Sequence, residues 1–199
     1  SYEELARYAA EKNTHWFASC WDEASVDFIE QFDPPCYKIA SASLTDDNLL
    51  RHHRRYSRPI IMSTGMSTIE QIDHAVEVLG TQDLILLHAT SAYPSQEKEL
   101  NLKAINTLRD RYQIPVGYSG HEIGLATTVG AVALGACVVE RHITLDRAMW
   151  GSDHPASVEP YGFSRLVRDI KVVEVAIGDG IKKVYDSEIP ILKKLRRVG

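Results

Sequence analysis

Two histidines, His121 and His142, each end or follow a run of apolar residues that is typical of a buried strand. The first lies in VGYSGHEIG (116–124) and the second in VVERHITL (138–145), two residues after Glu140. On neighbouring parallel strands the two imidazoles would lie close enough to hold one divalent transition metal ion. Glu140 would share the face of His142, because strand side chains alternate, and would orient substrate hydroxyls or contact the metal. The alternatives are two satisfied core histidines and a structural salt bridge.

A lysine and several serines form a second candidate group. Lys38 lies inside the apolar stretch CYKIAS (36–41), where an unpaired ammonium group is costly. Directed into a cavity it would bind an anion, and the hydroxyls of Ser41, Ser63 and Ser119 would complete a phosphate site. The alternative is a lysine that extends along an edge strand to reach solvent.

Two polar loops add further candidates. In the loop 88–102, Ser91 and Tyr93 are placed to hydrogen-bond a polyol, although Ser and Pro also build turns. In the loop 149–160, Asp153 would bind substrate or cap the following helix.

The elements that position these residues alternate between strand and helix. After a first helix over 1–12, the sequence predicts six strands, each followed by a helix, over 15–20, 36–41, 59–65, 84–90, 114–120 and 137–145. Their short, continuously apolar runs are typical of parallel strands that are covered on both faces. The first strand is not followed by the glycine-rich signature of a dinucleotide-binding sheet.

Polar side chains at the carboxyl end of every predicted strand favour a ring of strands over an open row, because they then converge on one site. A (β/α)8 TIM barrel has eight strands and about 250 residues, so we expect an α/β chain with about six of its βα units, the C-terminal three-quarters. Residues 1–199 would form one partial-barrel catalytic domain.

Composition narrows the class of protein. The 199 residues are 44% hydrophobic with a net charge of −5, which argues against nucleic acid or an anionic membrane as the main partner. No apolar stretch approaches the roughly 20 residues of a membrane span. Cys20, Cys36 and Cys137 are few and widely spaced, as expected for reduced thiols in the cytoplasm.

The chain resembles the sialic acid synthase family, which includes the N-acetylneuraminate and other nonulosonic acid synthases. The resemblance extends over essentially the whole chain and rests on CYKIASAS, PIIMSTGMSTIEQI, LLHATSAYP, VGYSGHEIG and ALGACVVERHITLDRAMWGSDHPASVEP.

The resemblance implies a barrel enzyme that condenses phosphoenolpyruvate with an acyclic N-acylmannosamine-type aldose. It implies a divalent metal, Mn²⁺ above all with Mg²⁺ or Co²⁺ as substitutes, held by His121 and His142. By motif match the phosphoenolpyruvate site would comprise Lys38, Ser41, Ser63 and Ser119, and the sugar site would comprise Ser91, Tyr93, Glu140 and Asp153. The family also suggests a homodimer.

The family's first two strands, with a glutamate and a second lysine, have no counterpart here, nor does its C-terminal antifreeze-like domain. We therefore expect the chain by itself to be incomplete for catalysis. Other hypotheses are a synthase of a different 3-deoxy sugar acid, an aldolase that uses Lys38 as a Schiff-base amine, and a barrel that binds sugar or phosphoenolpyruvate without turnover.

Overall fold

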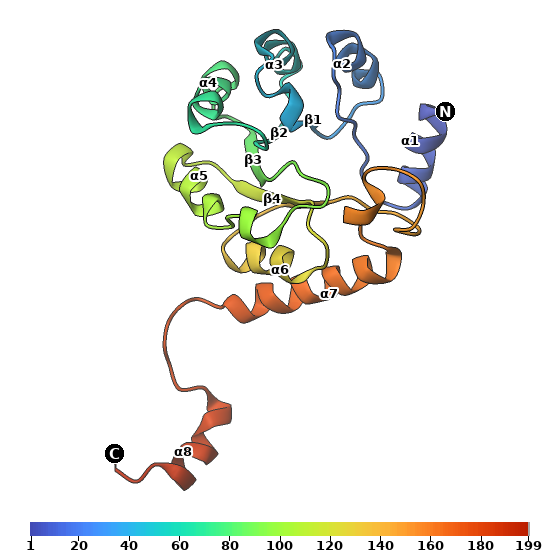
Figure 1. Cartoon of the computed structure of the whole chain (residues 1–199). Coiled ribbons are helices and arrows are strands. Elements are labelled where there is room, and N and C mark those ends of the chain that lie inside the picture. The colour runs from blue at the N-terminus through green and yellow to red at the C-terminus, as the bar shows by residue number, and fades with distance from the viewer. Residues whose placement is uncertain (199) are drawn as a thin grey trace.

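A computed structural model describes residues 1–198 and shows a single curled sheet of five parallel strands. The strands lie side by side in chain order, and helices run along the outer side of the sheet (Figure 1). The strands are β1 (Tyr37–Ile39), β2 (Ile60–Ser63), β3 (Leu84–Ala89), β4 (Val116–Gly120) and β5 (Val139–Arg141). Parallel neighbours joined by outer helices are the arrangement of a β/α barrel, so the expected partial TIM barrel is confirmed.

Eight α-helices belong to the described part of the chain. They are α1 (Tyr2–Glu11), α2 (Glu23–Glu30), α3 (Asp47–Arg54), α4 (Ile69–Leu79), α5 (Ala104–Tyr112), α6 (Ala126–Ala133), α7 (Pro160–Ile177) and α8 (Ile189–Leu195), and short 3-10 turns lie at Ser41–Ser43, Glu97–Glu99, His154–Ala156 and Asp186–Glu188. The helix α4 begins directly after Thr68, because the side chains of Thr68 and Gln71 each bond the other residue's backbone amide in a capping box.

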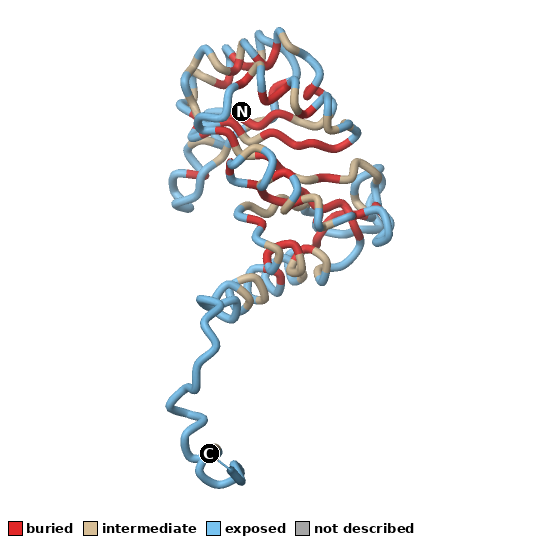
Figure 2. Tube along the Cα trace, turned by 90° about the vertical axis from the view of Figure 1, so that its left-hand side faces the viewer, coloured by how far each residue is buried: buried red, intermediate tan, exposed pale blue. Residues whose placement is uncertain are grey.

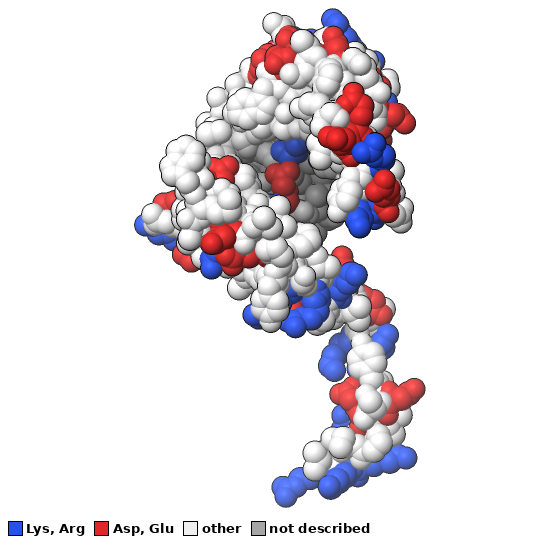
Figure 3. Space-filling model, turned by 90° about the vertical axis from the view of Figure 1, so that its right-hand side faces the viewer, with Lys and Arg blue, Asp and Glu red and all other residues white. Residues whose placement is uncertain are grey.

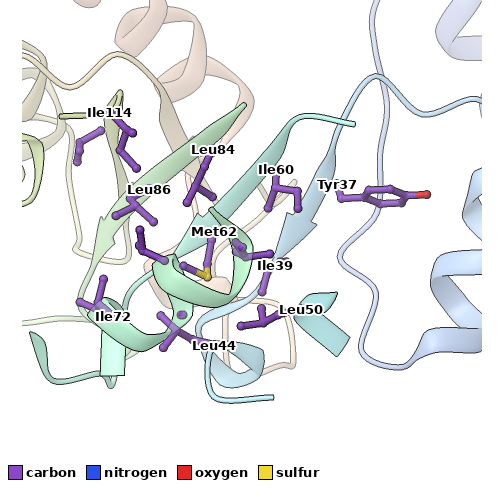
Figure 4. Close-up of a cluster of buried hydrophobic side chains, with 14 of the residues drawn as sticks. Tyr37, Ile39, Leu44, Leu50, Ile60, Met62, Ile72, Leu84, Leu86 and Ile114 are labelled. Atoms are coloured by element: carbon purple, nitrogen blue, oxygen red, sulfur yellow. The ribbon is translucent and has the colours of Figure 1, made fainter. Parts of the chain in front are cut away.

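The hydrophobic core lies between the outer face of the sheet and the helices. Alternate strand residues such as Ile39, Met62 and Leu86 point outward and meet Leu50 of α3 and Ile72 of α4 (Figure 4). Most residues of β1 to β4 are buried, and buried stretches run through the body of the molecule in Figure 2. Since most of this outer face is apolar, the opposite face of each strand remains for the polar side chains of the cavity.

The concave face of the sheet brings together residues that are far apart in the chain. Ser119 of β4 is level with Ala89 of β3 and with Glu140 of β5 in the strand register. Lys38 of β1 belongs to the same face, because its amine reaches the hydroxyl of Ser63 at the end of β2. The carboxyl ends of all five strands therefore meet above the concave surface.

The observed strands are shorter than the expected ones, and two of the expected strands differ most. The segment 15–20 makes only one parallel bridge, Ser19 to Lys38, so it is not the sixth full strand that the sequence predicts. It lies at the open edge of the sheet beside β1, and its apolar Trp16 packs against Phe32 instead of forming a ladder. The strand expected over 137–145 is also shorter, because it turns away from β4 after Arg141.

The C-terminal part leaves the body of the molecule. The long helix α7 lies against α6, and the chain then extends outward to α8 (Figure 1). Nearly all of this extension is exposed (Figure 2). In residues 1–198, no helix is both long enough and apolar enough to cross a bilayer. Cys20, Cys36 and Cys137 are free thiols, as expected.

Candidate active site

A cavity of about 530 Å³ opens on the concave side of the sheet, at the carboxyl ends of the strands. Figure 3 shows this face hollowed, with a basic and an acidic group inside the hollow. All ten residues that the sequence singled out for binding or catalysis line the cavity: Lys38, Ser41, Ser63, Ser91, Tyr93, Ser119, His121, Glu140, His142 and Asp153. They come from the ends of all five strands and from the loops that follow them.

Lys38 forms the basic part of the cavity. Its side chain is 10% exposed, and its amine donates to the hydroxyl of Ser63 at 2.8 Å and to the carbonyl of Ile39 at 3.1 Å. Burial lowers the pKa of Lys38, and the carboxylate of Glu140, 3.7 Å away, opposes that change without cancelling it. An anion beside this amine would replace the lost hydration and favour the charged form.

Glu140 lies between the lysine and the histidines. Its Oε1 accepts a hydrogen bond from Ser119 at 2.7 Å, and its Oε2 faces Lys38. Its side chain is 37% exposed, so the carboxylate is held by these neighbours and is still accessible from the cavity. The ion pair that was the alternative reading of Glu140 therefore exists, and it lies inside the cavity.

The two histidines lie side by side. Their ring centroids are 5.3 Å apart, and the ring of Tyr93 packs against both, at 4.3 Å from His121 and 5.4 Å from His142. The pKa of Tyr93 is raised, first by burial and then by the carboxylates of Asp153 and Glu140, so its hydroxyl remains protonated as a hydrogen-bond donor.

The backbone selects one tautomer of His121. Its Nδ1 lies 2.8 Å from the carbonyl of Thr90, which can only accept, so Nδ1 carries the proton and Nε2 keeps the lone pair. Burial lowers the pKa of His121, which keeps the ring neutral near pH 7. The Nδ1 of His142 lies 3.5 Å from the carboxylate of Asp153, so Asp153 is placed to orient this imidazole as well as to meet a substrate.

The imidazole nitrogens of His121 and His142 are suitable ligands for a divalent transition metal ion. Neutral imidazoles with the second ring nitrogen held by a carbonyl or a carboxylate are the usual protein environment of a metal-binding histidine. Among the described residues, no group of three or more His, Cys, Asp and Glu side chains is arranged around one ion. Two histidines alone leave coordination positions for water and a substrate oxygen.

One glycine shapes the wall between the serines. A side chain at Gly65 would place its Cβ 2.1 Å from the hydroxyl of Ser91 and 2.9 Å from that of Ser41. The Gly65 amide also donates to the Ser41 hydroxyl at 2.9 Å. Gly65 therefore allows the backbone to approach both hydroxyls and orients one of them.

Other lining residues were not among the sequence candidates. Ser19, Trp21 and Met66 also line the cavity, the last two with mostly exposed side chains. Ser19 lies near the end of the segment 15–20, so it is one of the polar strand-end residues that the sequence predicts to converge, although it was given no specific role. Trp21 and Met66 carry no comparable signal, because only the tertiary structure places their loops beside the cavity.

The fold and cavity together define a class: a β/α-barrel protein with its polar site at the carboxyl ends of parallel strands, where barrel enzymes carry their active sites. Residues 1–182 match the model of the NeuB family. The chain belongs to the NeuB family.

Named relatives agree with this assignment. The chain is 39% identical over 193 residues to the N,N'-diacetyllegionaminic acid synthase of Campylobacter jejuni, covering 94% of this chain and 58% of the relative. It is 39% identical over 197 residues to the N-acetylneuraminate-9-phosphate synthase of Homo sapiens, covering 98% of this chain and 55% of the relative. The chain thus spans little more than half the length of these relatives.

A crystal structure of an N-acetylneuraminic acid (sialic acid) synthetase from Leptospira borgpetersenii, in complex with citrate, has the same fold. The TM-score is 0.87 at 31% identity, and the alignment covers 100% of this chain and 72% of that one. The resemblance to sialic acid synthases noted in the sequence is therefore confirmed at the level of the family.

Proposed function

We propose that this chain carries the substrate-binding and metal-binding part of a nonulosonic acid synthase, which condenses phosphoenolpyruvate with an N-acylmannosamine-type aldose and releases phosphate. The observation that supports this most directly is the division of one cavity into two halves. Lys38 with Ser63 and Ser41 forms one half, and His121 with His142 forms the other. Glu140 lies between them.

The first half suits phosphoenolpyruvate. The ammonium group of Lys38 and the hydroxyls of Ser41 and Ser63 are donors that a phosphate or carboxylate needs, and burial strengthens the bonds of Lys38. Ser119 would join them when its hydroxyl turns from Glu140 to the ligand. Binding at this end would direct C3 of phosphoenolpyruvate toward the middle of the cavity.

The second half suits the aldose. His121 and His142 would hold a divalent metal ion, Mn²⁺ in our proposal, which when bound supplies Lewis acidity toward the sugar aldehyde. Tyr93, Ser91 and Asp153 would hydrogen-bond the sugar hydroxyls beside it. Glu140, fixed by Ser119, would orient the hydroxyl nearest the new bond.

The reaction balances with water as the third reactant. A bond forms between C3 of phosphoenolpyruvate and the aldehyde carbon, whose oxygen gains a proton. Water adds at C2, and the C2–O bond to phosphate breaks, leaving a 2-keto acid and inorganic phosphate. The homodimer and the cytoplasmic location remain predictions from the sequence.

The test is phosphate release from phosphoenolpyruvate with N-acetylmannosamine and Mn²⁺, with and without a chelator. It is made on the longest form of the protein that contains these residues, beside His121→Ala and His142→Ala. Release that needs sugar and metal and falls at least 100-fold in both variants is the expected result. Sugar-dependent release that survives the chelator and both substitutions would contradict the metal half of the proposal.

A Schiff-base aldolase is the second candidate, because burial lowers the pKa of Lys38 and so favours its nucleophilic amine form. Borohydride reduction in the presence of pyruvate separates the two. A covalent adduct on Lys38 would favour the aldolase, and no adduct favours the synthase.

A further inference from the structure

A buried ion pair lies directly behind the two histidines, and the proposed chemistry does not use it. Glu122 and Arg141 pair at 3.2 Å, with side chains 0% and 2% exposed. Arg141 lies between Glu140 and His142 in β5, so strand alternation turns it away from the cavity, toward the helices. A buried ion pair adds little to stability compared with well-packed apolar residues, so its presence beside a site calls for another explanation.

The guanidinium group of Arg141 joins three segments of the chain. It donates to the carboxylate and the backbone carbonyl of Glu122, the latter at 2.6 Å, and to the carbonyl of Gly124 at 3.0 Å, in the loop after β4. It donates to the hydroxyl of Thr128 in the first turn of α6 at 2.7 Å, and to the carbonyl of Ala156 at 3.4 Å. Only a planar fork with several N–H groups can serve all of these acceptors at once.

The carboxylate of Glu122 also accepts several hydrogen bonds, whereas the Nε of Arg141 has no partner among the described residues. It accepts from the hydroxyl of Tyr118 at 2.9 Å and from those of Thr127 and Thr128 at 2.7 Å each. Burial would raise the pKa of Glu122, but Arg141 and the two threonines outweigh it and the pKa is lowered, so the group remains ionised. A Cβ at Gly120 would lie 2.7 Å from this carboxylate and 3.0 Å from Arg141, so the strand end is closely fitted to the pair.

Each member of the pair is covalently bonded to one histidine of the cavity. His121 directly precedes Glu122, and His142 directly follows Arg141. Asp153, beside His142, directly precedes the turn His154–Ala156 whose last carbonyl Arg141 contacts. A shift of the pair would therefore move both imidazoles and the carboxylate that orients one of them.

We propose that Glu122 and Arg141 are positioning residues that hold His121 and His142 in the register needed to bind one divalent metal ion. This inference rests on the proposed function, because it assigns the pair a role toward the metal of that same site. Neither residue touches the metal or substrate in this scheme; each acts through the neighbouring histidine.

A comparable ion cluster at the amino ends of the strands offers a control for the Glu122–Arg141 pair. Arg58 also has a mostly buried guanidinium group that donates to two carboxylates, those of Glu30 and Asp33, and to the carbonyl of Pro34. It adjoins the amino end of β2 and none of these residues lines the cavity. Arg58→Lys therefore disturbs a comparable ion cluster without touching the histidines.

The experiment measures the dissociation constant for Mn²⁺ alone by electron paramagnetic resonance of the free ion, on the whole chain and well below its unfolding temperature. We expect Arg141→Lys to weaken Mn²⁺ binding by about 10- to 100-fold, and Arg58→Lys by less than about twofold. If the buried lysine prevents folding, Thr128→Val removes one bond to each member of the pair, and we expect a smaller loss, of about threefold or more. Equal Mn²⁺ affinities in wild type, Arg141→Lys and Thr128→Val would overturn the proposal.

A metal-free readout separates this proposal from the proposed function. The Nδ1 proton of His121, bonded to the Thr90 carbonyl, should give a slowly exchanging resonance by nuclear magnetic resonance. We expect Arg141→Lys or Thr128→Val to shift or broaden it, and Arg58→Lys to leave it unchanged. If the wild type binds no Mn²⁺, the metal assignment fails while this signal still decides whether the pair positions the ring. A resonance unchanged in both Arg141→Lys and Thr128→Val overturns the positioning role.

Discussion

A buried cation lies beside each end of β2, and the surroundings of the two cations change their pKa values in opposite directions. At the amino end, Arg58 lies against the carboxylates of Glu30 and Asp33, and these hydrogen bonds raise its pKa. At the carboxyl end, the amine of Lys38 reaches Ser63, and burial lowers its pKa. The protein stabilises the charge of the first cation and leaves the charge of the second poorly compensated.

The difference separates a structural ion cluster from a candidate binding site. Arg58 holds the loop after α2 against the start of β2, and every strong interaction it needs comes from this chain. The amine of Lys38 donates to the Ser63 hydroxyl and the Ile39 carbonyl, and the Glu140 carboxylate lies 3.7 Å away. These partners do not replace the hydration that the amine loses on burial. A buried cation with a poorly compensated charge beside a cavity is typical of a site that binds an anionic ligand.

The largest expected effect comes from removing the uncompensated cation. Lys38→Met should weaken phosphoenolpyruvate binding by about 100-fold, because a charge-assisted hydrogen bond to the anion is lost. The free energy of unfolding should not fall and should rise by about 1 kcal/mol, because a desolvated ammonium group is replaced by an apolar chain. Calorimetric titration and urea denaturation measure the two. A clear loss of stability with unchanged affinity would mean that Lys38 is structural.

Arg58→Met should do the reverse. Glu30 would lose its main partner while only 24% exposed, so the free energy of unfolding should fall by about 2 kcal/mol. Phosphoenolpyruvate affinity, measured on the folded protein, should change by less than about twofold. The comparison between the two ends would break down if Arg58→Met weakened ligand binding as strongly as Lys38→Met does.

The pH dependence of binding sharpens the comparison. Because the pKa of Lys38 is lowered in the folded state, the folded chain releases this proton at a pH where the unfolded chain, with a pKa of about 10.4, still holds it. As pH rises through the lowered pKa of Lys38 toward the unfolded value, phosphoenolpyruvate affinity should therefore fall several-fold while this group's contribution to the free energy of unfolding rises. Lys38→Arg, which stays charged, should show a flatter affinity profile; identical profiles would exclude Lys38 as the titrating group.

The smallest expected effect is at acid pH and at the amino end. Hydrogen bonds from Arg58 lower the pKa of Glu30, so its stabilising contribution is complete above its unfolded pKa of about 4.3 and is lost as pH falls through the folded value. Glu30→Gln should reduce the free energy of unfolding by about 1 kcal/mol at pH 7 and make it less sensitive to acid. Urea denaturation at pH 7 and pH 3 tests this, with Asp33→Asn, whose carboxyl is 92% exposed, as the control.

Much of the site could be predicted from the sequence because it depends on local rules. Polar residues directly after apolar runs, such as Ser63 and Ser119, must lie at the carboxyl ends of parallel strands. The two-residue spacing of Glu140 and His142 places them on one face. The same rule puts Arg141 on the other face, but its partner Glu122 could not be predicted, since nothing local links the two positions.

Errors in the predicted elements have a common origin. The apolar pattern of 15–20 satisfies a strand locally, yet a ladder also needs a partner strand in register, and this segment finds one only at Ser19. The strand expected over 137–145 likewise ends after Arg141, where the chain turns away from β4. In both cases the deciding contact lies outside the segment itself.

The sequence by itself determined the alternation of strands and helices and the set of polar residues at the strand ends, because both follow from the order of residue types along the chain. Only the tertiary structure decided how those residues interact. It brings Lys38 within 3.7 Å of Glu140, 102 residues later in the chain, and places the ring of Tyr93 against both histidines. Burial and partner distance set the charge state of each group, and both are created only when distant segments pack together.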